Sequence, residues 1–419
     1  MGNVGNMKII ENSLIYLSFS FISKAAPYLL LPFLTSYLEP TEFGKLSIFL
    51  VVNSLYVALI GMSMQANITK NFFNKSKYEL SLIIGNIFFI LIATTIFYFV
   101  IILIITLLIK YFFSIPSHYL LIAPIIALLT MINQIYLAIL QIQGRAYIFG
   151  ALEMVNTFLI TIITLIFLIY IKTGWVSQVI GIFASNLFIC FISIIYLLKQ
   201  DYLCLKFDKT KVVKILKLSI PLIPHVLGGL VIVVSDRFFI EKIVGIEAVA
   251  IYSVAYSFGL LVSLFTDSFV KAWSPWFHKQ LTDLTIKKKF LIVKLTYVYA
   301  VSVFIVAYIV FFISKNILPI IIDNRYADAV NYIWWIGLGY AIQGIYKIFY
   351  HYLLHINKTM FLALSTSLAA IANLFLNYFF VNIYGAIGAA YATAIAFFIS
   401  AILVFEYQRR NFPMPWLLK

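Results

Sequence analysis

The sequence predicts an all-α integral membrane protein, with about twelve transmembrane helices in two six-helix lobes around a central cavity. Three observations predict this fold class. Hydrophobic residues make up 63% of the 419 residues and charged residues only 11%, and the mean hydropathy is +1.03. About a dozen apolar stretches follow one another, each long enough to cross a bilayer, which takes about 20 residues in a helix. Lys and Arg crowd into every second gap between them.

The first six stretches are expected to form an N-terminal lobe at 1–198. A soluble core cannot use this much apolar surface, whereas a bilayer can. The first stretch is too long for the apolar region of a signal peptide, so we expect it to remain as a helix. The predicted helices of this lobe lie at 13–35, 46–67, 82–109, 119–140, 151–171 and 175–198.

A basic cytoplasmic linker is expected at 199–217, and its 3.6-residue periodicity predicts a helix on the membrane surface. The second six-helix lobe then covers 218–419. Two such halves, related as repeats, are a known transporter plan with the substrate path between them. The predicted helices of the second lobe lie at 218–239, 248–270, 290–313, 330–354, 360–382 and 386–407.

The distribution of basic residues predicts the orientation. With the N-terminus in the cytoplasm, 20 of the 30 Lys and Arg fall in inside segments. This bias follows the positive-inside rule, and the acidic residues do not share it. We therefore expect both termini in the cytoplasm. The net charge of +15 is interpreted as a topology signal with anionic lipid headgroups nearby, and no nucleic-acid partner is expected.

Lys24 is the most informative charge because it lies near the middle of the first predicted helix. A charged group there is expensive, so it is expected to face a wet cavity or, alternatively, to form a structural ion pair. Pro27 and Pro32 share this helix, and Pro221 and Pro224 take similar places in the seventh. Interior prolines kink helices, and kinks suit a lobe that bends, although they are common in membrane helices generally.

Further charges are candidates for the substrate path. Asp236 and Arg237 are expected at the end of the seventh helix, pointing about 100° apart. Lys347 lies deep in the tenth, and Lys271 and Arg145 lie near predicted inside ends. With Lys24, these cations suit an anionic substrate, because ammonium and guanidinium groups stabilise phosphate and carboxylate.

Three titratable residues are candidates for coupling transport to an ion gradient. Asp267 and Glu153 lie near predicted cytoplasmic helix ends, where they serve equally well as boundary residues. His225 lies one turn into the seventh helix, and a single His is more often a hydrogen-bonded packing residue than a proton relay.

Motifs for several enzyme and cofactor classes are absent. The sequence contains no GxxxxGK[ST], so no ATP-hydrolysing P-loop is expected. It contains no HExxH or CxxC, and we expect no metal, cofactor or disulfide framework; its two cysteines are Cys190 and Cys204. The outside acidic cluster of Asp323 and Asp328, beside Arg325, is interpreted as a solvated turn.

Several segments resemble bacterial polysaccharide exporters. PYLLLPFLTSYLEPTEFGKLSIF (27–49) resembles their first hairpin, and QIQGRAYIFG (141–150) their fourth-to-fifth helix turn. In the second half, SIPLIPHVLGGLVIVVSDRFFI (219–240), AVAIYSVAYSFG (248–259) and FVKAWSPWF (269–277) together look like Wzx-type O-antigen flippases. The likeness covers essentially the whole chain, and the joint order of these short motifs makes it specific.

This resemblance implies the fold of the multidrug/oligosaccharidyl-lipid/polysaccharide (MOP, MATE-like) exporter superfamily. It also implies a flippase in the bacterial inner (plasma) membrane. This flippase would move undecaprenyl-pyrophosphate-linked O-antigen units, for lipopolysaccharide, from the cytoplasmic to the periplasmic leaflet. Alternating access, coupled to an ion gradient, would drive it beside a polymerase and a chain-length regulator. Carried over by position, Lys24, Asp236 and Arg237 match charged positions at the family's cavity or its mouth, and Arg145 matches a basic turn.

Three other functions remain open at this point. An O-antigen polymerase, which is an enzyme, needs a large periplasmic loop with Arg residues, and every predicted outside gap is short. A MATE-like drug or cation exporter usually places acids in its cavity, whereas lysine dominates here. The charges within helices argue against a scaffold role. In a flippase, Tyr252, Tyr256 and Trp273 are expected to stack on sugar faces.

Overall fold

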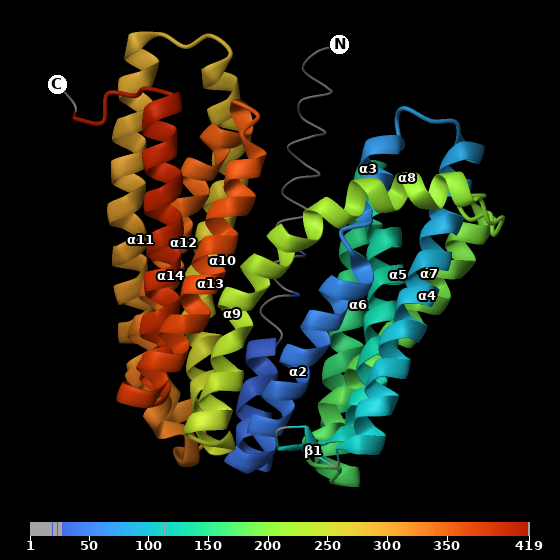
Figure 1. Ribbon diagram of the computed structural model, residues 1–419. Coiled ribbons are helices and arrows are strands. Elements are labelled where there is room, and N and C mark those ends of the chain that lie inside the picture. The colour runs from blue at the N-terminus through green and yellow to red at the C-terminus, as the bar shows by residue number, and fades with distance from the viewer. Residues whose placement is uncertain (1–18, 20–22, 24–26, 110, 113, 418–419) are drawn as a thin grey trace. The chain divides into compact units, whose positions relative to one another are not determined.

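The computed structural model describes residue 19, residue 23 and residues 27–417 except 110 and 113 (Figure 1). The described chain consists of helices and their connecting loops apart from a short hairpin of β1 (Tyr111–Phe112) and β2 (Ile115–Pro116), so the predicted all-α class is confirmed. Nine helices of this described part are long and apolar enough to cross a membrane. α12 has the length but not the apolar composition, because it is rich in Tyr, Trp and Gly.

The chain forms two compact units, residues 1–227 and 228–419, which divide within α9. In the first unit, residues 27–37 are helical, and most of the predicted helix at 13–35 lies outside the described residues. A 3₁₀ turn (Ser117–Leu121) precedes α5, and a π-helical turn (Ile166–Ile171) extends α6. The other helices of the first unit are α2 (Pro40–Gly61), α3 (Gln65–Asn71), α4 (Lys77–Leu108), α5 (Ile122–Ile142), α6 (Ala146–Leu165), α7 (Val176–Lys199) and α8 (Lys209–Ser219).

The predicted helix at 46–67 is broken, which corrects the sequence-based expectation. α2 ends at Gly61, and Met62 and Ser63 both have positive φ angles, of 42° and 54°. Side chains other than Gly rarely adopt this left-handed conformation, so the chain must turn here. The chain then continues as the short helix α3, where Gln65 Nε2 donates to Gln134 Oε1 of α5 at 2.5 Å. Hydropathy continues across the break, so the sequence pattern did not reveal it.

The linker at 199–217 contains the predicted basic helix, α8, which begins at Lys209. Asp208 caps it by accepting hydrogen bonds from the backbone N–H groups of Thr210 (2.9 Å) and Lys211 (3.2 Å). The hydroxyl of Thr210 also donates to Asp208 and holds the pKa of that carboxyl below its ordinary value. The apolar face of α8, with Ile215 buried, packs into the core of the first unit. α8 is therefore an amphipathic helix with its lysines on the outer face.

Asn86 of α4 fastens the extended segment that leads into α8. Its Nδ2 donates to the carbonyl of Lys206 at 3.1 Å, and its Oδ1 accepts from the N–H of Asp208 at 2.9 Å. The N–H of Cys204 donates to the carbonyl of Ser81 at 3.2 Å. The segment is thus hydrogen-bonded along α4 and is not a free tether.

The second unit is a bundle in which α12 packs against α10, α11 and α14, and α13 pairs with α14 (Figure 1). A short 3₁₀ turn (Ile220–Leu222) leads into α9, and another (Asn324–Ala329) precedes α12. A core of Ile232, Ala369, Ala370, Ala396 and Phe397 joins α9 to α13 and α14. The helices are α9 (Ile223–Ile243), α10 (Ile246–Leu281), α11 (Ile286–Ile321), α12 (Val330–His355), α13 (Thr359–Tyr384) and α14 (Ala386–Asn411).

Several helices of this unit, among them α9, α10 and α11, run beyond their predicted ends. α10 continues to Leu281, so most of the expected polar gap at 271–289 is helix. Phe269, Trp273 and Phe277 recur every four residues on one face, and this apolar stripe continues while lysines interrupt the overall hydropathy. α9 continues to Ile243, so Asp236 and Arg237 lie inside the helix and not at its end as predicted.

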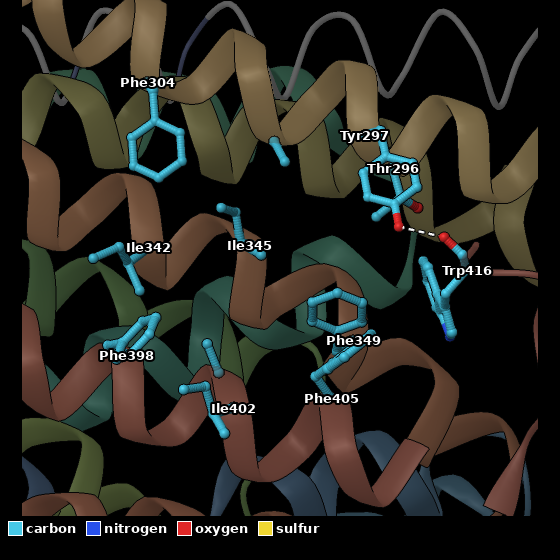
Figure 2. Close-up of a pocket in the computed structure, with 12 residues that line it drawn as sticks. Thr296, Tyr297, Phe304, Ile342, Ile345, Phe349, Phe398, Ile402, Phe405 and Trp416 are labelled. Carbon is cyan, nitrogen blue, oxygen red and sulfur yellow. Dashed lines mark hydrogen bonds between the residues drawn. The ribbon is translucent and has the colours of Figure 1, made fainter. Parts of the chain in front are cut away.

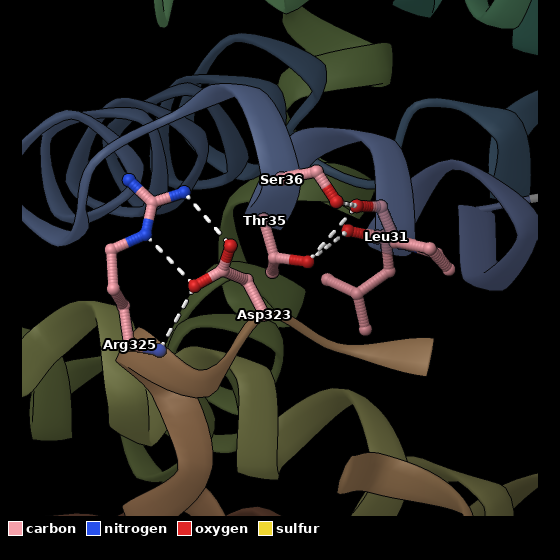
Figure 3. A network of polar contacts seen from close by, with 6 residues as sticks. Leu31, Thr35, Ser36, Asp323 and Arg325 are labelled. Atoms are coloured by element: carbon pink, nitrogen blue, oxygen red, sulfur yellow. Dashed lines mark hydrogen bonds and ion pairs between the residues drawn. The ribbon is translucent and has the colours of Figure 1, made fainter. Parts of the chain in front are cut away.

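The acidic cluster at 323–328 is a capped turn, as interpreted from the sequence. The carboxylate of Asp323 accepts from the Arg325 guanidinium at 2.9 and 3.2 Å and from its backbone N–H at 3.0 Å (Figure 3). The Arg325 guanidinium holds the pKa of the Asp323 carboxyl below its ordinary value. This ion pair closes the turn that starts the 3₁₀ segment before α12.

Candidate functional site

A cluster of buried polar side chains lies inside the second unit, and we call it the Asp236 cluster. In an apolar bundle such groups are expensive unless they are paired, and they mark functional sites by default. Five helices contribute to it: α9, α10, α12, α13 and α14. Its members are Ser235, Asp236, Arg237, Tyr252, Tyr256, Tyr340, Asn373, Asn377 and Thr393.

The Asp236 carboxylate is fully buried and is held by three neutral donors from three helices. The Tyr252 hydroxyl donates to it at 2.5 Å, and the Asn377 amide at 3.1 Å. The Thr393 hydroxyl lies 3.0 and 3.1 Å from its two oxygens. α10, α13 and α14 are thereby tied to α9 through one carboxylate.

A second row of amides and hydroxyls continues from this carboxylate. Ser235 donates to the Oδ1 of Asn373 at 2.8 Å, and the Asn377 amide reaches the same oxygen at 3.0 Å. Asn373 and Asn377 are one turn apart on α13, so both point at α9. The Oδ1 of Asn377 is buried and accepts no hydrogen bond within the described residues. One oxygen beside the carboxylate is thus unsatisfied as the cluster stands.

Arg237 turns away from Asp236 and packs on aromatic rings. Its guanidinium carbon lies 3.7 Å from the ring centre of Tyr256 and 5.3 Å from that of Tyr252. Its Nη1 donates to the carbonyl of Val233 at 2.7 Å. The hydroxyl of Tyr256 is hydrogen-bonded to that of Tyr340. Successive helical residues point about 100° apart, so the two groups make different contacts although their charges remain close enough to interact.

The cluster offers oxygen atoms to a small cation. The Asp236 carboxylate, the amide oxygens of Asn373 and Asn377 and the hydroxyls of Ser235 and Thr393 are all hard ligands. Such ligands suit cations like Na⁺, and a buried carboxylate suits a proton. The described residues contain no group of three or more His, Cys, Asp or Glu that could hold a metal ion. The site therefore fits a monovalent ion or a proton better than a transition metal.

Lys347 and Asp267 form an ion pair between α12 and α10. The Lys347 Nζ lies 2.6 Å from Asp267 Oδ1, and their side chains are 24% and 35% exposed. One predicted substrate-path residue and one predicted coupling residue thus neutralise each other.

We expect neutralisation of either partner alone to destabilise the second unit, because the remaining charge stays partly buried in an apolar bundle. The double variant Lys347→Met/Asp267→Asn should recover about 1–3 kcal/mol of this loss, the range found for side chains in direct contact. Thermal unfolding of the purified wild type, the two single variants and the double variant measures this coupling. Lys271→Met, an exposed lysine on α10, is the control. Strictly additive effects would show that the pair is not coupled.

The remaining predicted path and coupling residues are not part of the Asp236 cluster. Arg145 caps α6 in the first unit, and its Nη1 donates to the Tyr196 hydroxyl at 3.0 Å. Glu153 is half-buried on α6, and Lys271 is exposed on α10. Lys24 lies outside the described residues, and the side chain of His225 is likewise not described.

Two of the four predicted kink prolines, Pro221 and Pro224, lie at the start of a helix. Pro221 is in the 3₁₀ turn that joins α8 to α9, and Pro224 is in the first turn of α9. Pro27 begins the helical residues 27–37, and Pro32 lies within them. The hydroxyls of Thr35 and Ser36 donate to the Pro32 carbonyl at 3.1 and 2.8 Å (Figure 3). Such hydroxyl bonds to a carbonyl one turn back often accompany bent helices.

The aromatic residues expected to stack on sugars are instead buried. Tyr252, Tyr256 and Trp273 are at most 5% exposed, and the two tyrosines use their hydroxyls within the Asp236 cluster. The sequence reasoning missed Asn373, Asn377 and Thr393. Two amides four residues apart in an otherwise apolar stretch, NLFLN, were the signal that could have found the first two.

Comparisons with known proteins agree with this architecture. A family model described as "Polysaccharide biosynthesis protein" matches residues 9–280. The chain is 23% identical over 374 residues to "Lsg locus putative protein 1" of Haemophilus influenzae, covering 87% of this chain and 89% of that one. It is 24% identical over 288 residues to an uncharacterized membrane protein of the same organism, covering 68% of each.

Two solved structures share the fold. An inward-facing MATE family transporter of the MOP superfamily matches with a TM-score of 0.75 at 13% identity, over 95% of this chain and 97% of that one. The lipid II flippase MurJ, in an inward closed conformation, matches with a TM-score of 0.70 at 16% identity, over 96% and 88%. Both likenesses concern the fold.

Proposed function

The chain belongs to the polysaccharide biosynthesis protein family, as a Wzx-like flippase with the MOP-superfamily fold, and from this premise we propose which substrate it moves and how. It is a transporter and not an enzyme, and it moves a lipid-linked polysaccharide precursor across the membrane. The proposed substrate is an undecaprenyl-pyrophosphate-linked O-antigen repeat unit. The proposed direction is from the cytoplasmic to the periplasmic leaflet of a bacterial inner membrane.

One observation carries the proposal: the match to a polysaccharide family coincides with the fold of flippases and exporters. The family match supports a glycan as cargo. The nine apolar helices support a route through the bilayer for a substrate whose tail stays in lipid. The bias of Lys and Arg supports cytoplasmic termini.

The proposed mechanism is alternating access between two lobes, 1–198 and 218–419, joined by the linker at 199–217. Pro221 and Pro224, at the junction of α8 and α9, are suited to absorb changes of backbone angle there. A polymerase and a chain-length regulator of the same pathway are the proposed protein partners, because they consume the flipped unit.

The Asp236 cluster supports coupling to an ion gradient. A buried carboxylate with an unsatisfied amide oxygen beside it can take up H⁺ or Na⁺ when the site opens to one side. Rotation of the Asn377 amide by half a turn would aim its oxygen at the ion. This assigns coupling to Asp236 ahead of Asp267, whose carboxylate already has Lys347 as partner.

Deletion of the gene in the bacterium that carries it tests the substrate. Loss of long-chain polysaccharide, with complete repeat units accumulating on undecaprenyl pyrophosphate facing the cytoplasm, is the expected result. Complementation with the wild-type gene is the control. Surface repeat units that fail to lengthen would indicate a polymerase instead, and unchanged polysaccharide with raised drug sensitivity would indicate a drug exporter.

A further inference from the structure

A cavity of about 340 Å³ lies in the second unit between α11, α12 and α14 (Figure 2). We call it the α11–α12–α14 slot. Its volume lies in the range of pockets that hold small ligands, about 300–1,000 Å³. Phe398 and Ile402 on its edge are 52% and 47% exposed, so the slot opens on the surface of the unit.

The lining of the slot is apolar. Its side chains come mainly from Phe, Ile and Ala, and its two polar members have already used their donors. The Thr296 hydroxyl donates to the carbonyl of Ile292 at 2.9 Å, and the Tyr297 hydroxyl to the carbonyl of Trp416 at 2.6 Å (Figure 2). Apart from the indole Nε1 of Trp416 at one end, this lining lacks the free hydrogen-bonding partners that sugars need, so the slot suits hydrocarbon along its length.

The slot is elongated. Its lining residues run from Phe398 to Phe405 on α14 and from Thr296 to Phe304 on α11. Seven to eight residues of helix span about 10–12 Å at a rise of 1.5 Å per residue. This length and the flanking aromatic rings suit a chain that lies along the helices better than a compact ligand.

One end of the slot is capped by the residues that follow α14. Trp416 packs there on Phe349 and Phe405, with ring centres 5.6 and 5.4 Å apart. Lys289 Nζ donates to the carbonyl of Pro413 at 3.2 Å and, with the hydroxyl of Tyr297, fastens this cap to α11. The slot is thus a groove with a closed end, unlike the open outer faces of neighbouring helices.

Basic residues surround the capped end. Lys287, Lys288 and Lys289 lie in the first turn of α11, and two arginines lie in the last turn of α14, Arg409 and Arg410. The acids there, Asp283 and Glu406, pair with Lys288 and with both arginines, which leaves an excess of positive charge. The indole Nε1 of Trp416 is buried and has no acceptor within the described residues. Cations and an unpaired donor at one end favour an anionic headgroup such as phosphate.

We propose that the α11–α12–α14 slot binds the polyprenyl chain of the lipid-linked substrate, with its phosphate at the capped, basic end. The inference rests on the proposed function for the identity of this lipid. Methyl-branched, unsaturated isoprene units fill a slot walled by Phe304, Phe349 and Phe398 better than a straight acyl chain does. The slot would hold the tail at the surface of the second unit while the glycan crosses elsewhere.

Photolabelling of the purified full-length protein in lipid nanodiscs tests the slot. The probe is a short polyprenyl phosphate with a diazirine on the chain, and mass spectrometry maps the labelled residues. We expect label on α11, α12 and α14 residues of the slot. An excess of unlabelled polyprenyl phosphate should remove it, and an equal excess of phosphatidylglycerol should not.

Two variants narrow the slot, and one matched variant does not. Ala300→Phe fills it from α11, and Ile402→Trp fills it from its exposed edge, where folding tolerates a larger ring. Both should reduce labelling of the slot at least about tenfold. Val301→Phe, on the adjacent residue, which is 60% exposed and outside the slot, should leave labelling unchanged.

Three results would overturn the inference: label outside the slot, label that survives both filling variants, or competition by phosphatidylglycerol as strong as by polyprenyl phosphate. The last would mean a general lipid groove.

The photolabelling experiment measures binding and not export, so the slot proposal and the transport proposal fail separately. Labelling of the slot with unchanged polysaccharide in the deletion strain would reject the transport proposal and keep the slot. Accumulated intermediates with label elsewhere would reject the slot alone.

Discussion

Polysaccharide export is expected to fall by at least about 10–100-fold when Asp236 is replaced by Asn, while the protein remains folded. Removing a residue that only hydrogen-bonds a metal ligand typically lowers metal affinity or activity by about 10–100-fold. We expect at least this loss for a residue that would itself contact the ion. Asn keeps the shape of Asp and can still hydrogen-bond Tyr252 and Thr393. It removes the charge that would attract an ion or accept a proton. Surface polysaccharide per unit of membrane-inserted protein is the measurement.

Thermal stability separates this functional loss from a structural one. Asp236→Asn removes a buried carboxylate, which favours the variant, but it also leaves the buried Arg237 guanidinium without its neighbouring anion, which disfavours it. These two changes oppose each other, so we expect a melting temperature close to that of the wild type. Asp283→Asn is the matched control, because it makes the same change at an exposed loop carboxylate. Normal export by Asp236→Asn at normal protein level would rule out Asp236 as the coupling residue.

Gly388→Ala is expected to destabilise the second unit by about 1–3 kcal/mol or more, the range for inserting a carbon atom into a packed interior. A Cβ at Gly388 would lie 2.1 Å from the carbonyl oxygen of Phe380 and 2.3 Å from its carbon. These are backbone atoms of α13, so no side chain can rotate away, and the α13–α14 hairpin must open. The melting temperature should drop on the order of 5 °C for a unit of this size.

Gly229→Ala supplies the control on α9. A Cβ there meets nothing within 4 Å, and Ala is a better helix former than Gly by about 0.8–1.0 kcal/mol. This variant should match or exceed the wild type in melting temperature. The melting temperature is measured by heating the detergent-solubilised protein and following the loss of its monomer peak in size-exclusion chromatography. Equal melting of the two variants would show that α13 and α14 do not approach as closely as described.

The fold was accessible from the sequence because each helix is encoded locally. Apolar stretches located α4, α5 and α7 to within a few residues, since length and hydropathy suffice for a helix in a bilayer. The end of α10 was misplaced because its apolar stripe continues after average hydropathy falls, and the end of α9 because its last turns carry charged residues such as Glu241 and Lys242. The two residues with positive φ at the break, Met62 and Ser63, are neither Gly nor Pro. Gly61 lies before the turn, so the sequence does not mark where the helix breaks.

The Asp236 cluster was accessible only in part. Asp236 and Arg237 stood out as charges in an apolar setting, and their divergence follows from helix geometry. Their partners are remote: Asn377 and Thr393 lie 141 and 157 residues from Asp236. A single sequence gives no sign of which polar residues in five helices meet. Lys347 and Asp267 were likewise noted only as separate charges. They lie 80 residues apart in the sequence, which gives no sign that they form an ion pair.

The fastening of the linker to α4 bears on how the protein is made. The hydrogen bonds from Asn67 of α3 to Ser219, at 2.9 Å, and between Asn86 of α4 and the linker fasten the linker and α8 to earlier parts of the chain. Domains generally fold as units during synthesis, with the N-terminal one first. Once Ser219 has left the ribosome, the residues that make these hydrogen bonds are all present, so the linker can be fastened before α10 to α14 are translated. A chain stalled at that point would carry a folded first unit in the membrane. The helix α8 would be the last part of that unit to be hydrogen-bonded in place.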